Sequence, residues 1–204
     1  PACVRPPYFD FENAYAEAAM AGTPELQERL YKEMLARIKE TDLSVPYRKG
    51  RYWYYARTEE GKQYPILARK LGALTSAEEL VLDLNVLARD HAYFAVDAFV
   101  VSDDGNFLAY SVDTTGFREY TLHVRDLRRG EDGPESIEKV SSVAWAADGK
   151  TLFYVEDDDA KRAYRLFRHR RDEGGAQLVR EEADERFSLT IRRSRSLGYL
   201  FLDA

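Results

Sequence analysis

The stretch "VSDDGNFLAYSVDTTGFREYTLHVRDL", residues 101–127, decides the fold because the chain repeats it as "AWAADGKTLFYVEDDDAKRAYRLFRHR", residues 144–170. A shift of 44 residues aligns the two without a gap and places Asp104-Gly105 on Asp148-Gly149. Further identities follow in the same register: Leu108 with Leu152, Tyr110 with Tyr154, Asp113 with Asp157, Arg118 with Arg162, Tyr120 with Tyr164, and Leu122 with Leu166. One Asp-Gly turn occurs in any antiparallel sheet, but two in one register with matching strands define a structural repeat.

This repeat predicts the blades of a β-propeller. Units of about 40–50 residues with four strands each are typical of such blades. Residues 50–70, "GRYWYYARTEEGKQYPILARK", are interpreted as a diverged earlier copy, and residues 194–204, "SRSLGYLFLDA", as the inner hairpin of another blade. Residues 46–204 therefore predict a mainly β fold, an incomplete propeller of about three blades plus the start of a fourth.

The expected propeller is open rather than closed. A single four-stranded sheet cannot cover its own apolar faces, so blades must stack around a channel until the ring closes. We therefore expect the chain to be a fragment, or the ordered part, of a longer protein. Taken alone, it should be poorly soluble or oligomeric, because a strand edge and a blade face stay uncovered.

Residues 1–45 predict a helical extension in front of the propeller. Residues 12–20 are rich in Ala and Glu, which favour helix. Thr23 is expected to cap a second helix that begins at Pro24 and runs to about Glu40. Its apolar face repeats every four residues and consists of Leu26, Leu30, Met34 and Ile38. Such a face must pack on another part of the protein.

Strands are predicted to begin soon after this extension. Aromatic residues 50–58 and residues 64–70 are interpreted as a hairpin, and residues 79–83 as a further strand. A capping box that starts at Ser76 makes a helix the alternative for the last of these. Asn85 is expected to cap a short helical turn.

Composition and charge disfavour several classes of protein. The formal net charge of −6 argues against nucleic acid as a partner, and the basic runs at 168–171 and 192–195 have acidic neighbours. No run approaches the roughly 20 apolar residues of a membrane helix, so no membrane partner is expected. The single cysteine, Cys3, permits no internal disulfide and favours a reducing compartment. With no signal-peptide pattern at the N-terminus, we expect a cytoplasmic location.

The residues show no pattern of an active site. The G-x-S-x-G motif of hydrolase nucleophiles is absent, and His91, His123 and His169 are scattered, which favours surface or packing roles. The acidic run "EDDDAK", residues 156–161, lacks the alternating ligand spacing of a calcium loop. We therefore predict no catalytic, cofactor-binding or metal-binding residue in this chain, and no cofactor.

Four segments nevertheless resemble a known family. They are "ENAYAEA" at 12–18, "LYKEMLARIKETDLSVPYRKGRYWYYARTEEGKQYPILARK" at 30–70, "LDLNVLARDHAYFAV" at 82–96, and "LAYSVDTTGFREYTLHVRDL" at 108–127. Together they are similar to the N-terminal part of bacterial oligopeptidase B, also called protease II, within the prolyl oligopeptidase family of serine peptidases. The resemblance covers nearly the whole chain.

The resemblance implies a function that these residues alone do not. In the family, a seven-bladed propeller gates access to a C-terminal α/β-hydrolase domain, and the helical extension packs on that domain. The parent would be a serine endopeptidase that cleaves short peptides after Arg or Lys. Its Ser-Asp-His triad and the acidic residues that bind the basic side chain belong to the hydrolase domain, so no site residue is carried over. The implied partners are that hydrolase domain and short basic peptides.

Two other interpretations stay open. A propeller of the WD-repeat type would serve as an interaction module, but its Gly-His and Trp-Asp dipeptides are absent, and Trp145 is followed by Ala. A prolyl-specific peptidase or an aminopeptidase of the same family would share the propeller and differ in the hydrolase domain.

Overall fold

The computed structural model describes residues 7–171 and 173–204, which form two compact units. The described residues up to Asp42 make the first unit, and Leu43–Ala204 make the second. Cys3, on which the expected reducing compartment depends, lies outside the described residues.

The first unit consists of helices α1 (Pro7–Met20) and α2 (Pro24–Ala36). The sequence predicted that Thr23 caps α2. Thr23 does occupy the N-cap position, but its hydroxyl makes no capping hydrogen bond. The hydroxyl donates to the carbonyl of Met20 at 2.8 Å and accepts from the side-chain amide of Gln27 at 2.7 Å. The helix also ends before Glu40, because the N–H of Arg37 and of Ile38 bonds three residues back, at 3.2 and 2.9 Å, which tightens the last turn.

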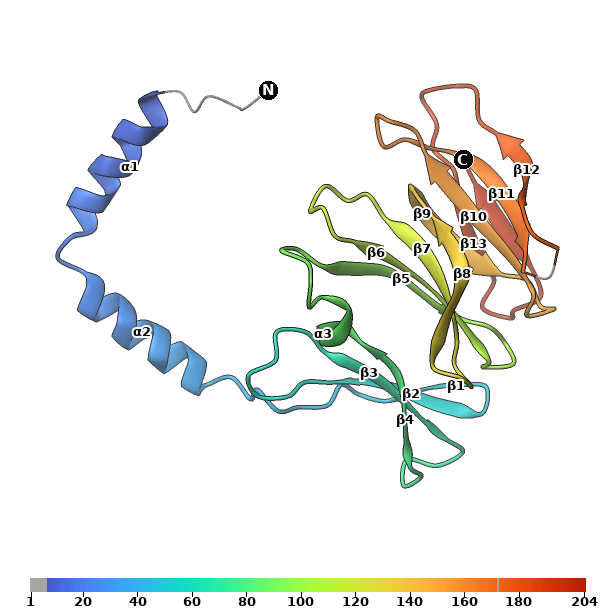
Figure 1. The fold of residues 1–204 in the computed structure, drawn as a ribbon, viewed down its shortest axis with the longest axis horizontal. Helices are drawn as coiled ribbons and strands as arrows, with labels where there is room; N and C mark the ends of the chain where they lie inside the picture. Colours follow the sequence, from blue (N-terminus) through green and yellow to red (C-terminus); the bar gives the residue numbers. More distant parts are fainter. Residues whose placement is uncertain (1–6, 172) are drawn as a thin grey trace. The chain divides into compact units, whose positions relative to one another are not determined.

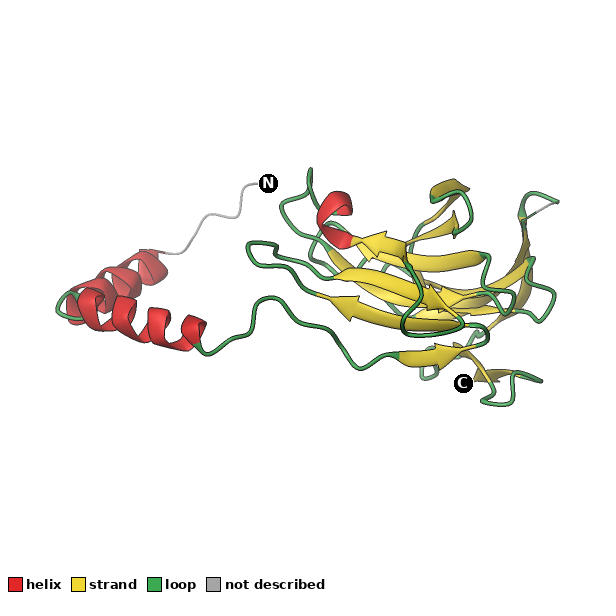
Figure 2. Ribbon diagram, turned by 90° about the horizontal axis from the view of Figure 1, so that it is seen from below, coloured by secondary structure: helices red, strands yellow, loops and turns green. Residues whose placement is uncertain are grey.

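The second unit contains antiparallel sheets that follow one another along the chain (Figures 1 and 2). Blade 1 contains β1 (Tyr47–Lys49), β2 (Tyr52–Arg57), β3 (Ile66–Leu71) and β4 (Glu78–Asp83). Blade 2 contains β5 (Ala95–Val101), β6 (Phe107–Asp113), β7 (Thr121–Asp126) and β8 (Glu131–Ile137). Blade 3 contains β9 (Val140–Trp145), β10 (Thr151–Asp157), β11 (Ala163–Arg170) and β12 (Ala176–Glu181), and blade 4 contributes β13 (Thr190–Arg193) and β14 (Leu200–Asp203).

The 44-residue repeat is also the register of the backbone pairing. Leu108 in β6 pairs with Val101 and Arg125, and Leu152 in β10 pairs with Trp145 and His169. Each partner in blade 3 therefore lies 44 residues after its equivalent in blade 2. The Asp-Gly turns fix this register because each closes a hairpin of the same length. The prediction of consecutive blades is confirmed.

The core is divided into layers between neighbouring blades. Successive residues of a strand point to opposite faces, so Leu108 and Tyr110 pack toward blade 1 while Ala109 packs toward blade 3. Trp145 and Leu152 complete the layer between blades 2 and 3. A third layer between blades 3 and 4 is formed by Ala144, Val155, Leu166, Leu189 and Ile191. Each blade therefore covers the apolar face of the blade before it.

The segment after β4 differs in detail from the expectation. Residues 78–83 form a strand, not the alternative helix, and α3 (Leu84–Leu87) follows. The cap of α3 is Asp83, whose carboxylate accepts the N–H of Asn85 at 2.9 Å, so the sequence assigned the cap to the wrong residue. The side chain of Asn85 instead bonds the N–H and carbonyl of Tyr64, at 2.9 and 2.7 Å. It thereby ties α3 to the residues that precede β3.

Candidate functional site

The first strands of the blades form the inner edge of the second unit, where β5 contacts β9 and β9 contacts β13. We call the edge where these strands end the clasped rim; it comprises Lys49, residues 100–105, Trp145 and Arg193. We call the opposite edge, near their beginnings, the open rim; it comprises Asp97, Arg118, Tyr120, Ser141, Asp157 and Lys161. Because a propeller channel runs along its first strands, these rims border the two ends of any such channel.

At the clasped rim, three blades each donate hydrogen bonds to the end of β5 in blade 2. The ammonium of Lys49 in blade 1 donates to the carbonyl of Val101 at 2.6 Å. The indole N–H of Trp145 in blade 3 donates to the carbonyl of Val100 at 2.8 Å. The Arg193 guanidinium in blade 4 donates to both carboxylate oxygens of Asp103, at 2.6 and 2.8 Å. The end of β5 and the turn that follows it are therefore the shared attachment point of the blades.

Blade 1 makes a further contact with the turn of blade 2. Arg69 is buried, donates to the carbonyl of Gly105 at 2.5 Å, and lies 3.9 Å from the ring centre of Tyr52. Gly105 has φ +74°, and a Cβ there would lie 2.9 Å from the Tyr52 ring. Only glycine fits this position without displacing the ring, so the Asp-Gly turn serves contact between blades as well as the hairpin.

Matching aspartates stabilise the two Asp-Gly turns. Asp104 accepts from the hydroxyl of Ser102 at 2.5 Å and from the N–H of Asn106 at 3.0 Å. Asp148 accepts from the N–H and hydroxyl of Thr151, at 2.8 and 2.7 Å. Burial raises the pKa of each carboxyl group, but these hydrogen bonds outweigh it and the net pKa lies below the usual value. Both side chains are therefore held as ionised turn caps.

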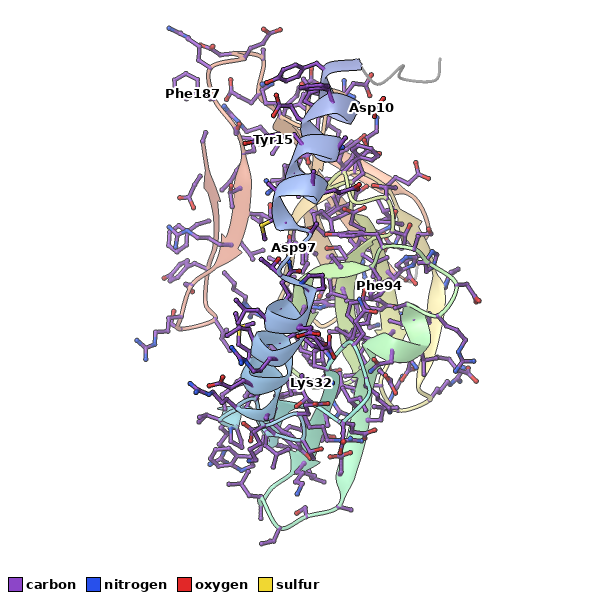
Figure 3. The ribbon with its side chains drawn as sticks, turned by 90° about the vertical axis from the view of Figure 1, so that its left-hand side faces the viewer. Asp10, Tyr15, Lys32, Phe94, Asp97 and Phe187 are labelled. Carbon is purple, nitrogen blue, oxygen red and sulfur yellow. The ribbon has the colours of Figure 1, made fainter. Side chains whose placement is uncertain are left out.

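The open rim surrounds a polar hollow of about 480 Å³ between blades 2 and 3, lined by Asp97, Arg118, Tyr120, Ser141, Asp157 and Lys161. Asp97 is exposed on β5 at a register shift between Val96 and Phe99, and Figure 3 shows its position. The ammonium of Lys161 donates to the carbonyl of Phe117, which joins the turns of the two blades. Acidic and basic side chains therefore face one solvent-filled space.

Asp97 also borders a second hollow, which is apolar. It measures about 330 Å³ and lies between blade 1 and β5, where Tyr47 stacks on Tyr54 with ring centres 5.7 Å apart. The remaining lining residues are Ser44, Tyr55, Ala56, Leu67, Ala68, Leu84, Val96 and Phe99. Burial raises the pKa of the Tyr54 hydroxyl despite the nearby Arg69, so the phenol stays neutral in this surface.

The acidic run at residues 156–161 forms a turn whose backbone N–H groups are accepted by a carboxylate. In blade 2, Asp113 is fully buried and accepts the N–H groups of Thr115, Gly116 and Arg118, at 2.8, 3.1 and 2.7 Å. In blade 3 this role belongs to Asp158, which accepts the N–H of Ala160 and of Arg162, both at 2.9 Å. Among the residues that the structure describes, no cluster of His, Cys, Asp and Glu side chains could hold a metal ion.

The sequence repeat therefore aligned Asp113 with Asp157, although Asp158 is the residue that caps this turn in blade 3. Asp157 aligns with Asp113 in sequence, but a register shift between Glu156 and Asp157 moves the capping role to the next residue. One carboxylate oxygen of Asp157 is buried without a hydrogen-bond partner among the described residues. Burial is the main cause that raises the pKa of Asp157, and it outweighs the hydrogen bond with the Ser141 side chain and the charge of Lys161, which lower the pKa; the neighbouring Asp158 and Glu156 raise it further.

The three histidines each contact a different neighbour. His91 stacks on Phe94, with ring centres 6.2 Å apart, and His123 lies 5.6 Å from Tyr110. The Nδ1–H of His169 donates to the carbonyl of Gly175 at 3.0 Å, because a carbonyl can only accept. The helices of the described chain are all too short and too polar to cross a membrane.

A succession of four-stranded antiparallel sheets, with first strands innermost and apolar layers between blades, defines the class of β-propeller domains. The chain belongs to the prolyl oligopeptidase family, since residues 4–204 match the family model described as "Prolyl oligopeptidase, N-terminal beta-propeller domain". The resemblance drawn from the sequence is confirmed, and so is the fold class.

Two curated relatives show how far this similarity extends. The chain is 39% identical over 207 residues to "Dipeptidyl aminopeptidase BI" of Pseudoxanthomonas mexicana, covering 92% of this chain and 29% of the relative. It is 34% identical over 205 residues to "Protease 2" of Moraxella lacunata, covering 96% of this chain and 30% of the relative. The chain thus spans less than a third of the length of these relatives.

Two solved structures of oligopeptidase B share the fold. The enzyme from Leishmania major superposes with a TM-score of 0.83 at 26% identity, over 95% of this chain and 28% of that one. The enzyme from Trypanosoma brucei, in a closed form with covalently bound antipain, gives a TM-score of 0.83 at 28% identity, with the same coverage of both chains.

Proposed function

We propose that this chain is the propeller part of a serine oligopeptidase that cleaves short peptides after Arg or Lys, and that the propeller controls access to the catalytic domain. The observation that carries this proposal is the family match over residues 4–204, together with the similarity to two oligopeptidase B structures. Bond cleavage itself is assigned to an α/β-hydrolase domain outside these residues, with serine as nucleophile, histidine as base and aspartate to orient it.

The arrangement of the blades supports selection of substrates by size. The first strands of neighbouring blades contact one another, as they do around the channel of a propeller, and we propose that the completed channel admits an extended peptide and excludes a folded domain. The clasped rim limits how far these strands can separate, while the open rim presents a wide polar hollow. A substrate would be chosen by its width rather than by contacts to its side chains.

The helical unit supplies a surface for the proposed hydrolase domain. The apolar face of α2 is exposed at every position, and it comprises Leu26, Leu30, Tyr31, Met34 and Leu35. Figure 3 shows side chains of both helices, with Tyr15 and Lys32 labelled. We propose that this face packs on the hydrolase domain, because a helix gains most of its stability from burying such a face.

A second candidate function is removal of dipeptides from a free N-terminus. The relative named "Dipeptidyl aminopeptidase BI" is 39% identical to this chain, against 34% for "Protease 2", so neither activity is favoured by identity alone. A prolyl-specific activity is the third possibility within the family.

One matched set of substrates distinguishes these activities. The full-length protein is assayed with Arg-Arg-coumarin carrying a blocked N-terminus, with the same dipeptide unblocked, and with a blocked substrate that has Pro before the coumarin. We expect turnover of the blocked Arg substrate. Turnover of the unblocked one alone would identify an aminopeptidase, turnover of the Pro substrate alone a prolyl peptidase, and no turnover at all would reject the proposed function.

We also propose a cytoplasmic location on the basis of the single cysteine, since secreted domains of the disulfide-bonded kind use cysteines in pairs. Fractionation of the source cells with an antibody against the chain would test this. Recovery from the periplasm or the medium would contradict it.

A further inference from the structure

The β13–β14 hairpin of blade 4 is attached to the rest of the second unit by a small set of contacts. The N–H of Ile191 donates to the hydroxyl of Ser142 in blade 3 at 3.1 Å, and the side chains of Leu189 and Ile191 are buried. The bond from Arg193 to Asp103 joins this hairpin to blade 2, across 90 residues of sequence. It bypasses blade 3 altogether.

We propose that Asp103, Arg193 and Lys49 form an ionic clasp that fixes the ends of the first strands of blades 1, 2 and 4, and thereby limits the width of peptide that can pass this end of the propeller. The part of this inference that concerns passage rests on the proposed function. The part that concerns the attachment of the blades does not.

The geometry of Arg193 is that of a fixed, two-pronged bond rather than a loose surface pair. Its two terminal nitrogens reach the two oxygens of Asp103, and its Nε and Nη2 also donate to the carbonyl of Leu197, at 3.1 and 2.7 Å. The side chain of Arg193 is 14% exposed and that of Asp103 is 28% exposed. Bidentate pairs of this kind are stronger and more directional than single contacts between exposed charges.

Lys49 makes Asp103 an anion shared by two cations. The ammonium of Lys49 bonds to Val101, two residues before Asp103. Burial lowers the pKa of Lys49, Asp103 raises it, and Arg193 lowers it, so all three charges act on one another. Without the Asp103 carboxylate, Lys49 would keep the repulsion from Arg193 and lose the attraction that opposes it. Loss of the carboxylate should therefore separate the blades more than loss of the guanidinium.

This asymmetry gives the clasp a measurable signature. Arg193→Gln leaves the attraction between Lys49 and Asp103 intact, whereas Asp103→Asn leaves mutual repulsion. Arg193→Lys keeps the charge but removes the two-pronged bond, and its effect should lie between the wild type and Arg193→Gln. The matched control is Arg192→Gln, because Arg192 pairs with Asp203 at 2.5 Å and, among the described residues, its contacts stay within the same hairpin.

Hydrogen exchange of backbone amides in the full-length protein tests the attachment of the hairpin. The N–H of Ile191 reports docking on blade 3, while the N–H of Ser194, bonded to the carbonyl of Tyr199 at 2.8 Å, reports the hairpin itself. We expect exchange at Ile191 to rise about three- to tenfold in Arg193→Gln and further in Asp103→Asn, with Ser194 unchanged in Asp103→Asn and Ile191 unchanged in Arg192→Gln. Equal exchange in Arg193→Gln and Arg192→Gln would overturn the clasp.

Hydrolysis of peptides of two lengths tests the effect on passage. A blocked Arg-coumarin dipeptide is compared with a long peptide of roughly 30 residues that contains one Arg and that spans roughly 30 Å as a flexible coil, wider than a single extended strand. Loss of the clasp should raise the rate for the long peptide relative to the short one several-fold. An unchanged ratio, with faster exchange at Ile191, would overturn the claim on passage. If no peptide is cleaved, the proposed function fails, and the exchange result alone decides whether the clasp holds the blades.

Discussion

The clasped rim and the open rim are opposite ends of the same first strands, yet they use charge in different ways. At the clasped rim, Lys49 bonds to the last residue of β5 and Arg193 bonds to Asp103 in the turn that follows, and Trp145 adds a neutral donor. At the open rim, six polar residues line a hollow of about 480 Å³, and an oxygen of Asp157 has no partner among the described residues. At the clasped rim paired charges hold blades together, whereas at the open rim charged groups of both signs line a hollow.

The largest expected effect comes from removing the neutral anchor of the clasped rim. Trp145 is 1% exposed and fills the layer between blades 2 and 3. Trp145→Ala should lower the free energy of unfolding by about 3–5 kcal/mol, because it leaves a cavity and frees the carbonyl of Val100. Urea denaturation followed by circular dichroism measures this change.

The matched variant is Tyr120→Ala, which removes a half-buried ring from the open rim. Its loss should be about 1–2 kcal/mol, since the space left behind joins a hollow that already contains solvent. Equal losses in the two variants would show that the rims do not differ in how they contribute to stability.

A smaller effect is expected at the two Asp-Gly turns. Gly105→Ala must accommodate φ +74° and a contact at 2.9 Å with the Tyr52 ring, which Arg69 holds in place. Gly149→Ala meets only the positive φ of +64°, because its nearest neighbour lies at 3.5 Å. We expect losses of about 2–3 kcal/mol and about 1 kcal/mol respectively. A denaturant series on both variants tests the order, and a larger loss at Gly149 would contradict the role given to the turn of blade 2.

The sequence predicted the fold more completely than it predicted the contacts of the candidate site. The spacing of the Asp-Gly turns predicted which residues pair across β6 and β10, because turn geometry and alternation act locally and fix the register. It did not reveal the bond from Arg193 to Asp103, since these residues are 90 apart in sequence and meet only after the blades have stacked. It also matched Asp157 to Asp113, because a shift of one residue in pairing leaves no mark in the pattern.

The smallest expected effects concern Asp113 and Asp157, whose contributions to stability change in opposite directions as the pH changes. Burial raises the pKa of Asp113, but hydrogen bonds from Thr115, Arg118 and Gly116 outweigh it and the net pKa lies below the usual value. Stability from this group is present above its unfolded pKa of about 4 and is lost as the pH falls through the folded value. The pKa of Asp157 is raised, chiefly by burial, so stability is lost as the pH rises from about 4 through the folded value.

Asparagine at each position resembles the protonated acid. The free energies of unfolding of the two Asn variants therefore test these opposite pH dependences. At pH 7, Asp113→Asn should destabilise the protein by about 1–2 kcal/mol, and Asp157→Asn should stabilise it by up to about 1 kcal/mol. The difference for Asp157→Asn should shrink toward zero as the pH falls to about 4, whereas the difference for Asp113→Asn should begin to shrink below about pH 4 and vanish only below the lowered folded pKa of Asp113. Denaturation curves between pH 3 and pH 8 provide the test. Destabilisation by Asp157→Asn at pH 7 would mean that Ser141 and Lys161 stabilise the Asp157 carboxylate more than burial destabilises it, and that the open rim holds its charges as firmly as the clasped one.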